Sequence, residues 1–284
     1  CGSDAHSSSN TSMALKTAVI TGSTKGIGKG YAKAFLNRGL NVVVAGRSQE
    51  SVDAAIQDLD GEGKDGARTA GVVCEVSDAI EVQVLWDFAK QEFETVDIWI
   101  NNAGFARSGV TLLQLTPDEI ETMVQGNVIG TINGCQVALR GMTAQGFGHI
   151  YNTYGAGSDG RVIPGMIGYG TTKSAARYFT ESLIRELKGR HIRVGMISPG
   201  MNLTENMINQ MKQVPPPARP KVMKPINLLG DYVEPTTPWI VDCVLADDKP
   251  GTHIKWLTTG KILRRLLMAP FSKRDLWARY DLST

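Results

Sequence analysis

From Lys16 onward, short runs rich in Val or Ile alternate with amphipathic stretches of helical length. Such alternation is typical of repeated βαβ units, because two parallel strands need a long crossover connection that packs on one face of the sheet. We therefore expect a Rossmann-type, doubly wound parallel sheet in a three-layer α/β/α arrangement. The predicted strands are 17–21, 41–45, 69–74, 96–101, 149–153 and 193–198.

The segments between these strands predict helices, and one of them carries a clear start signal. Thr116 places a capping hydroxyl before Pro117 at the first helical position, and two acids follow in the first turn. The predicted helices are 27–37, 50–59, 79–94, 117–145 and 168–187, followed by a helix at 238–246 and a strand at 253–257.

The length of 284 residues suits one domain better than two. We expect residues 14–284 to form a single Rossmann-fold domain, and residues 1–13, which are polar and Ser-rich, to be a disordered segment or a tag. Residues 213–225 contain five prolines, which predicts an extended surface loop and not a helix. We assign 201–232 as a substrate lid and 258–284 as a C-terminal tail.

Net charge and cysteine spacing argue against several classes of function. Lys plus Arg number 30 against 28 Asp plus Glu, and the pI near 8.3 indicates no strongly basic surface for nucleic acid. The four cysteines form no CxxC pair and no cluster with His, as a zinc site or disulfide framework would require. No stretch approaches the roughly 20 consecutive apolar residues that cross a bilayer. We expect a soluble chain without a metal or a nucleic-acid partner.

The segment that joins the first predicted strand to the first predicted helix is rich in glycine. Without a Cβ, the backbone can turn tightly, approach a pyrophosphate closely and present N–H groups at the positive end of a helix. A glycine-rich turn between a strand and a helix is where a dinucleotide phosphate binds. The predicted contacts are Gly22, Ser23, Thr24, Lys25, Gly26, Ile27 and Gly28.

The end of the second predicted strand indicates which dinucleotide binds. A site for NAD usually places an acid there to accept hydrogen bonds from the ribose hydroxyls, but this chain has Arg47 and Ser48. Arg47 and Lys25 offer charge and hydrogen-bond donors to the 2′-phosphate of NADPH, whereas the alternative is that both are solvated surface charges. We predict NADPH (NADP+) as the cofactor, contacted by Arg47 and Ser48, with NADH as the less favoured one.

Tyr169 and Lys173 are four residues apart in a predicted helix, so their side chains share one face. A free tyrosine has a pKa near 10, and it serves as an acid–base group at neutral pH only where a cation stabilises its phenolate. Lys173 is such a cation. The same spacing is also typical of a surface pair, so the interpretation depends on motifs elsewhere in the chain.

The order of motifs along the chain resembles that of the short-chain dehydrogenase/reductase family. The resemblance covers roughly residues 16–204 and rests on Thr21 to Gly28, Asn101-Asn102-Ala103-Gly104, Asn127, Tyr169 to Lys173 and Pro199-Gly200. It implies an oxidoreductase in which Tyr169 is the acid–base residue. Asn127 would hold a water that relays protons through Lys173.

The resemblance also implies further contacts with the cofactor. Glu75-Val76 stands near the adenine, where the family usually has Asp-Val. The residues Asn102, Ala103 and Gly104 would flank the adenosine side, and Pro199, Gly200 and Thr204 would lie beside the nicotinamide.

The serine of the family pattern is displaced in this chain. It usually stands 13 residues before the tyrosine, where this chain has Ala156, which carries no hydroxyl. Ser158 is the nearest candidate to hold the substrate oxygen, with Thr153 and Tyr154 as less favoured ones. The alternative is that Ser158 is a turn serine that contacts only backbone.

Three further segments resemble plant and algal chlorophyll(ide) b reductases: 152–161, 198–204 and 254–261. The resemblance implies reduction of the C7 formyl group of chlorophyll b or chlorophyllide b to a hydroxymethyl group, in a chloroplast, in the stroma or on the thylakoid surface. Two alternatives remain open. One is a generic short-chain reductase of a ketone, sterol or acyl-type substrate, and the other is a weakly catalytic NADPH-binding scaffold.

Two kinds of contact follow for the outer surface. The basic, apolar composition of 261–277 is typical of a helix on an anionic membrane surface, and a subunit contact fits it equally well. The family resemblance implies a homodimer or homotetramer formed through the helices at 117–145 and 168–187.

Overall fold

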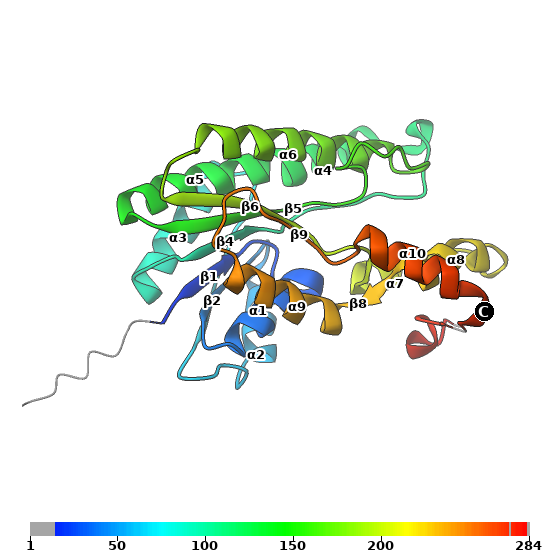
Figure 1. The fold of residues 1–284 in the computed structure, drawn as a ribbon, viewed down its shortest axis with the longest axis horizontal. Helices are drawn as coiled ribbons and strands as arrows, with labels where there is room; N and C mark the ends of the chain where they lie inside the picture. The colour runs from blue at the N-terminus through cyan, green and yellow to red at the C-terminus, as the bar shows by residue number, and fades with distance from the viewer. Residues whose placement is uncertain (1–14, 273, 283–284) are drawn as a thin grey trace, which may run out of the picture.

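A computed structural model of the protein describes residues 15–272 and 274–282. The predicted N-terminal segment 1–13 lies outside the described residues. Seven parallel strands form the central sheet in the order β3-β2-β1-β4-β5-β6-β9 (Figure 1). The predicted doubly wound sheet is confirmed, and 253–257 supplies its seventh strand. The strands are β1 Thr17–Ile20, β2 Asn41–Gly46, β3 Thr69–Val73, β4 Ile98–Asn101, β5 Gly148–Thr153, β6 Ile192–Ser198 and β9 His253–Lys255.

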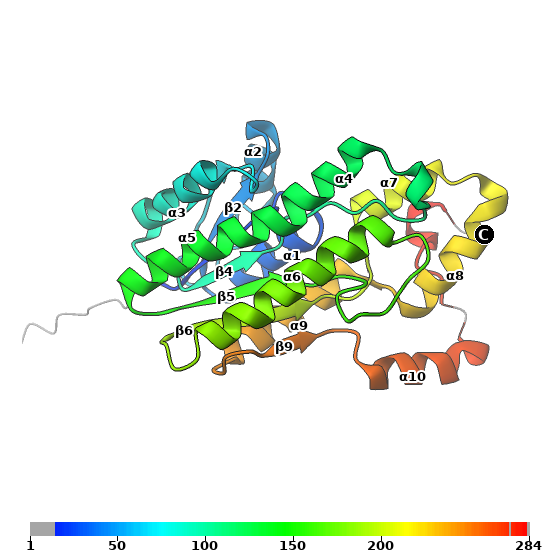
Figure 2. The same ribbon diagram turned by 90° about the horizontal axis from the view of Figure 1, so that it is seen from above.

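Helices cover both faces of the sheet, as the alternation of buried side chains requires. Ala18 and Ile20 of β1 belong to the core on one face, whereas Val19 between them belongs to the core on the other. Helices α1, α2 and α9 cover the first face, and α3, α5 and α6 cover the second (Figures 1 and 2). Their bounds are α1 Gly26–Leu36, α2 Gln49–Asp58, α3 Ala79–Phe93, α4 Pro117–Val124, α5 Gly130–Gln145, α6 Ile167–Glu186 and α9 Val233–Ala246.

The helix predicted over 117–145 is interrupted. A π-helical turn, Gln125–Ile129, separates α4 from α5. The predicted start is confirmed as a capping box, because Thr116 Oγ1 accepts from Glu119 N at 3.2 Å and Glu119 Oε2 accepts from Thr116 N at 3.0 Å. Single π turns inside α-helices are often found at functional sites, and this one contains Asn127.

The predicted lid forms a small substructure with its own core. Its two short strands pair in parallel, and its helices pack around Met223 and Trp277, which are 1% and 0% exposed. The lid elements are β7 Asn202–Leu203, α7 Glu205–Gln213, a 3₁₀ turn at Pro216–Ala218, α8 Arg219–Leu229 and β8 Asp231–Tyr232. The predicted tail contains α10 Thr259–Met268 and 3₁₀ turns at Ala269–Phe271 and Ala278–Tyr280, and a further 3₁₀ turn, Leu112–Gln114, precedes α4.

Two expectations about proline were wrong. Residues 213–225 were expected to be an extended loop, but most of them form a 3₁₀ turn and the first half of α8. Pro220 lies in the first turn, where its missing N–H has no helical partner to lose, and Pro225 is tolerated inside a helix that buries Met223 and Ile226. Likewise, α9 begins at Val233, five residues before Pro238, which lies inside the helix.

Candidate active site

The predicted site residues gather at the carboxyl ends of the parallel strands, beside the position where the strand order reverses between β1 and β4. The lid elements α7 and α8 lie at this same end of the molecule (Figure 2). In open α/β sheets this crevice is where ligands bind.

The glycine-rich turn after β1 is packed so closely that larger residues do not fit. A Cβ on Gly28 would lie 2.4 Å from the carbonyl oxygen of Gly22, and a Cβ on Gly22 would lie 2.7 Å from Ala103 Cα. Gly22 also has a φ of 61° and Gly26 one of 58°, in the left-handed region that favours glycine. The turn therefore needs these glycines for its own shape.

Side chains of the predicted cofactor site hold the turn in place. Thr21 Oγ1 accepts from the main-chain N–H groups of Asn102 and Ala103, at 3.0 and 3.1 Å. Asn102 Nδ2 donates back to the carbonyls of Thr21 and Gly22, at 3.0 and 3.1 Å. Ser23 Oγ donates to Ile20 O at 2.6 Å and accepts from Ala45 N at 2.9 Å. Asn102 and Ser23 thus fix the backbone on which a phosphate would rest.

The N-terminus of α1 is suited to an anion. Lys25 is its N-cap residue and makes no capping hydrogen bond with its side chain, and the first turn, which includes Ile27, contains no acid. The first N–H groups of the helix are therefore free to donate to a phosphate.

The corner that would receive a 2′-phosphate is basic and open. Thr24 Cγ2 would lie 2.4 Å from a Cβ on Gly46, so the glycine turn packs against the end of β2. Lys25 and Arg47, the residues that follow, are both exposed. Ser48 caps α2 by accepting from Ser51 N at 3.3 Å.

Glu75 and Val76, predicted near the adenine, lie directly after β3. Glu75 Oε1 accepts from Ser77 N and Ser77 Oγ, at 3.1 and 3.0 Å. Val76 is 7% exposed and packs on α5, where a Cβ on Gly130 would lie 2.5 Å from its Cγ2. The Glu75 carboxylate thus stabilises its own turn.

Tyr169 and Lys173 lie together on the buried side of α6. Lys173 Nζ donates to the carbonyl of Thr153 at 3.0 Å and is 5.7 Å from the centre of the Tyr169 ring. Burial lowers the pKa of Lys173 to about 8 and raises the pKa of Tyr169 to about 12. At neutral pH the phenol therefore holds its proton, next to an ammonium group that would stabilise the phenolate left after proton transfer.

Asn127 connects the loop after β4 to α6, the helix that carries Tyr169 and Lys173. Its Oδ1 accepts from Phe105 N at 2.9 Å, and its Nδ2 donates to Phe105 O and Thr172 Oγ1, both at 2.9 Å. A Cβ on Gly104 would lie 2.6 Å from Asn127 Oδ1 and 3.8 Å from Lys173 Nζ. Both side-chain donors of Asn127 are thus occupied, so the expected relay water would use one of its oxygens.

Gly155 was not singled out from the sequence, and it lies against the phenol of Tyr169. A Cβ there would be only 2.0 Å from the Tyr169 hydroxyl oxygen. Nearby Gly157, with a φ of 90°, packs on Gly170, whose Cα would lie 2.7 Å from a Cβ at that position. A tyrosine packed directly on a main-chain Cα has no sequence signal apart from the glycines themselves.

Ser158 is fastened to α6 through its backbone. Its carbonyl accepts from Arg177 Nη1 at 3.0 Å, its N–H donates to Gly155 O at 3.1 Å, and the residue is 7% exposed. Of the other two candidate hydroxyls, Tyr154 donates to the carbonyl of Arg177 at 3.4 Å. Thr153 Oγ1 is buried and has no hydrogen-bond partner within the described part of the chain.

The loop after β6 reaches back to the glycine turn. Gly200 has a φ of 75°, and Asn202 Nδ2 donates to Pro199 O at 2.8 Å. Thr204 caps α7 and would contact a Cβ on Gly26 at 3.4 Å. Across the crevice, Gln210 of α7 donates to the carbonyl of Ala106 at 3.5 Å. Gln210 is a second residue that sequence reasoning missed.

These features fit a nicotinamide dinucleotide: a glycine turn that leaves no room for side chains, a helix N-terminus without a cap, and a buried Tyr–Lys pair. No cluster of metal-ligating side chains occurs within residues 15–272 and 274–282. In the same part of the chain, no helix is long and apolar enough to span a bilayer.

Comparisons with known proteins agree with this geometry. The family model described as short chain dehydrogenase matches residues 16–215. A chloroplastic chlorophyll(ide) b reductase of Oryza sativa subsp. japonica is 36% identical over 87% of this chain and 73% of its own length. One of Arabidopsis thaliana is 35% identical over 92% of this chain and 74% of its own length. This chain spans only 54% of a probable chlorophyll(ide) b reductase of Arabidopsis thaliana, to which it is 31% identical.

Solved structures share the fold. Levodione reductase superposes with a TM-score of 0.76 at 25% identity, over 87% of this chain and 97% of that one. An actinorhodin polyketide ketoreductase solved with NADPH gives a TM-score of 0.75 at 21% identity, over 87% and 97% of the two chains.

Proposed function

This chain belongs to the short-chain dehydrogenase family, and we propose that it uses NADPH to reduce the C7 formyl group of chlorophyll b or chlorophyllide b. As a member of this family it is an oxidoreductase that acts on carbonyl or hydroxyl groups with a nicotinamide cofactor. The observation that carries the proposal is the buried pair Tyr169–Lys173 in a chain whose similar relatives include chlorophyll(ide) b reductases.

The chemistry is that of aldehyde reduction. When bound, NADPH supplies a hydride to the formyl carbon. As negative charge develops on the oxygen, Tyr169 donates its proton, and Lys173 stabilises the resulting phenolate. A hydroxyl holds the substrate oxygen; Ser158 is the candidate from the sequence, and the unpartnered Thr153 Oγ1 is the alternative that its burial supports.

The preference for NADPH is proposed from the basic corner. Arg47 and Lys25 are exposed next to the end of β2, and no acid of that strand faces a ribose. Changing Arg47 to Asp should weaken binding of NADPH by about tenfold or more, because it replaces a charge-assisted donor with a repelling acid, and it should leave NADH binding nearly unchanged. Titration of both cofactors measures this. Equal losses for the two cofactors would refute the assignment.

A macrocycle needs a wide, apolar cleft. Met211 and Met223 are buried in the lid's own core, so Met201 and Met207, which are partly exposed, are the lid methionines available for its wall. Two further points belong to the same proposal. A homodimer or homotetramer through α4, α5 and α6 is supported by the family. A chloroplast location is supported by the names of the relatives. Light scattering that shows only monomers would remove the first of these.

Turnover tests the proposal directly. Chlorophyllide b with NADPH should give the 7-hydroxymethyl product, and Tyr169→Phe should abolish turnover while cofactor binding persists. Absence of product with an enzyme that binds NADPH would reject the pigment as substrate.

A steroid or ketone substrate is the second candidate, because a 3alpha-hydroxysteroid dehydrogenase of Mediterraneibacter gnavus is 36% identical over 67% of this chain. Ketosteroids and generic ketones therefore belong in the same assay. If none of these substrates turns over although NADPH binds, the scaffold alternative gains support.

A further inference from the structure

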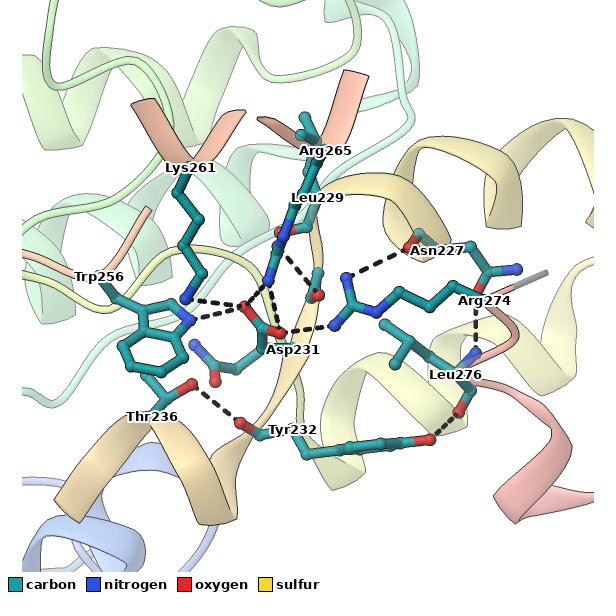
Figure 3. Close-up of polar contacts among 12 residues, drawn as sticks. Asn227, Leu229, Asp231, Tyr232, Thr236, Trp256, Lys261, Arg265, Arg274 and Leu276 are labelled. Atoms are coloured by element: carbon teal, nitrogen blue, oxygen red, sulfur yellow. Dashed lines mark hydrogen bonds and ion pairs between the residues drawn. The ribbon is translucent and has the colours of Figure 1, made fainter. Parts of the chain in front are cut away.

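Helix α10 turns two of its cations, Lys261 and Arg265, inward, whereas Arg264 and most of its apolar side chains are exposed. Arg265 Nη2 lies 2.8 and 2.7 Å from the two carboxylate oxygens of Asp231, and Lys261 Nζ lies 3.7 Å from the nearer one (Figure 3). The leucines Leu263, Leu266 and Leu267 are 57%, 51% and 67% exposed, and Phe271 beyond the helix is 82% exposed. Met268, which faces the cleft described below, is 54% exposed.

This orientation is the reverse of what water favours. A surface helix of a globular protein turns its apolar stripe to the core and its charges to solvent. No residue of α10 is buried, so its leucines are not part of any core of this chain. Contiguous exposed apolar surface of this kind marks a contact with something that the described chain does not include.

A basic cleft runs beside the apolar face, between α8 and α10. It has a volume of about 660 Å³ and combines cations with apolar side chains. Its cations are Lys224, Arg264, Arg265 and Arg274, and Met223, Leu228 and Met268 line it as well.

The charge around this cleft is positive in excess. Three cations, Lys261, Arg265 and Arg274, surround the single carboxylate of Asp231, which leaves a local charge of +2. The sequence contains no Asp or Glu in 219–229 or in 259–274. The cleft therefore suits an anionic group attached to an apolar body.

We propose that the α8–α10 end docks on a lipid surface, with the leucines of α10 inserted below the headgroups and an anionic headgroup in the basic cleft. Apolar insertion flanked by cations is how interfacial helices bind anionic membranes. A second copy of this chain fits less well, because a two-fold contact through this end would bring its cations against the same cations of the partner.

Docking through the α8–α10 end would place the crevice next to the lipid. The role of this placement in substrate delivery rests on the proposed function. The loops that border the crevice carry Leu113 and Val162, which are 97% and 95% exposed, and a hydrogen bond of 2.8 Å from Gly109 N to Gly165 O joins them. These loops lie at the same end of the molecule as α8 and α10 (Figures 1 and 2). A pigment held in lipid would then enter the crevice without crossing water.

Co-sedimentation with vesicles tests the docking. The full chain should pellet with vesicles of phosphatidylcholine and phosphatidylglycerol, and the double variant Leu266→Ser, Leu267→Ser should lose about tenfold in partition for each leucine. The matched control is Ile80→Ser on α3, an apolar residue 76% exposed, which should bind like the wild type. An equal loss in the control, or a wild-type chain that stays in the supernatant, would overturn the proposal.

The charge is tested separately. Arg264→Gln and Lys224→Gln should each weaken binding to the anionic vesicles by about fivefold, with no change on pure phosphatidylcholine. Lys188→Gln, which removes an exposed cation just after the C-terminus of α6, should have no effect. Displacement of the chain from vesicles by glycerol phosphate would also support the headgroup site.

A second copy of the chain is the alternative occupant of the apolar face. If the wild type does not bind vesicles but self-associates, and the leucine variants lose this self-association, the face belongs to a second copy instead.

Docking and catalysis can fail independently. Turnover of chlorophyllide b without pelleting would refute the docking alone, whereas pelleting without turnover would refute the proposed substrate alone.

Discussion

The face of α6 that carries Lys173 and the C-terminal end of the molecule bury charge in opposite ways. Lys173 is enclosed without a counter-charge, and its nearest polar partner is a carbonyl at 3.0 Å. Asp231 is 6% exposed, and three cations and the Trp256 indole N–H surround it. Burial by itself raises the pKa of Asp231, but the hydrogen bonds from Arg265 and Trp256 outweigh it and hold the pKa below its usual range. The first arrangement lowers the pKa of an ammonium group that lies beside a phenol. The second attaches the lid and α10 to the body of the molecule.

The largest effect should come from a methyl group on the catalytic side. Gly155→Ala would place a Cβ 2.0 Å from the Tyr169 hydroxyl and displace it, so turnover should fall by about 10²–10⁴, the usual contribution of a positioned acid. Initial rates measure this. Gly260→Ala on α10 is the matched control, because a Cβ there meets nothing within 4 Å. If both variants turn over at the wild-type rate, the phenol is not where the chemistry occurs.

The C-terminal end should be sensitive in stability and not in chemistry. Asp231→Asn keeps the shape but leaves Lys261, Arg265 and Arg274 without a counter-charge, which should cost about 3 kcal/mol in free energy of unfolding. Urea unfolding followed by Trp fluorescence measures it, since Trp277 is fully buried in that core. A midpoint equal to that of the wild type would mean that the cations are stable without Asp231.

A pH series should separate the two arrangements further. Burial lowers the pKa of Lys173 from 10.5 to about 8. Below pH 8 the ammonium is charged in both the folded and the unfolded chain, so the fold bears the whole cost of burying it. This cost decreases as the pH rises and is absent above about pH 10.5, where the amine is neutral in both states. Lys173→Met should therefore gain stability over the wild type as the pH falls from 10.5 to 8, by about 3 kcal/mol, and no more below it. Thermal unfolding across this range checks the prediction. A pH-independent difference would contradict the burial of an unpaired ammonium.

The smallest effect should come from the exposed pair Arg279–Glu234, which lies near the Asp231 cluster in sequence but is open to solvent. Glu234→Gln should leave the urea midpoint unchanged within error, because exposed ion pairs are screened by water and salt. A loss as large as that of Asp231→Asn would mean that burial does not distinguish the two sites.

Local patterns predicted most of the fold. The six strands and the five main helices of the first 200 residues lie within one or two residues of their expected bounds, because each pairs a period of apolar residues with a recognisable start or end. The π turn at Gln125–Ile129 was not predicted, since it depends on the contacts of Asn127 with Phe105 and Thr172 on other elements. The expectation for 213–225 was wrong because it considered only the low helix propensity of proline. Burial of Met223 and Ile226 in a separate core stabilises the helix in spite of the prolines.

For the site, the sequence predicted the residue types and the chain of motifs but not their contacts. Tyr169 and Lys173 were paired correctly by helical spacing, whereas the role of Gly155 depends on a distance between a loop and a helix. Ser158 stays a prediction, because its observed bonds are those of its backbone.

The amino-acid sequence by itself determined a parallel sheet with covered faces, a glycine turn for a dinucleotide and a phenol with an ammonium one helical turn away. These features are local, since they depend on periodicity and on spacing within one segment. Only the tertiary structure decided that Lys261 and Arg265 of α10 turn inward to Asp231 while its leucines are exposed, because the composition of a helix does not specify which face meets the body. The orientation of α10 depends on ion pairs with Asp231, some 30 residues away in the chain. These contacts exist only in the folded protein, so the local sequence of the helix does not contain them.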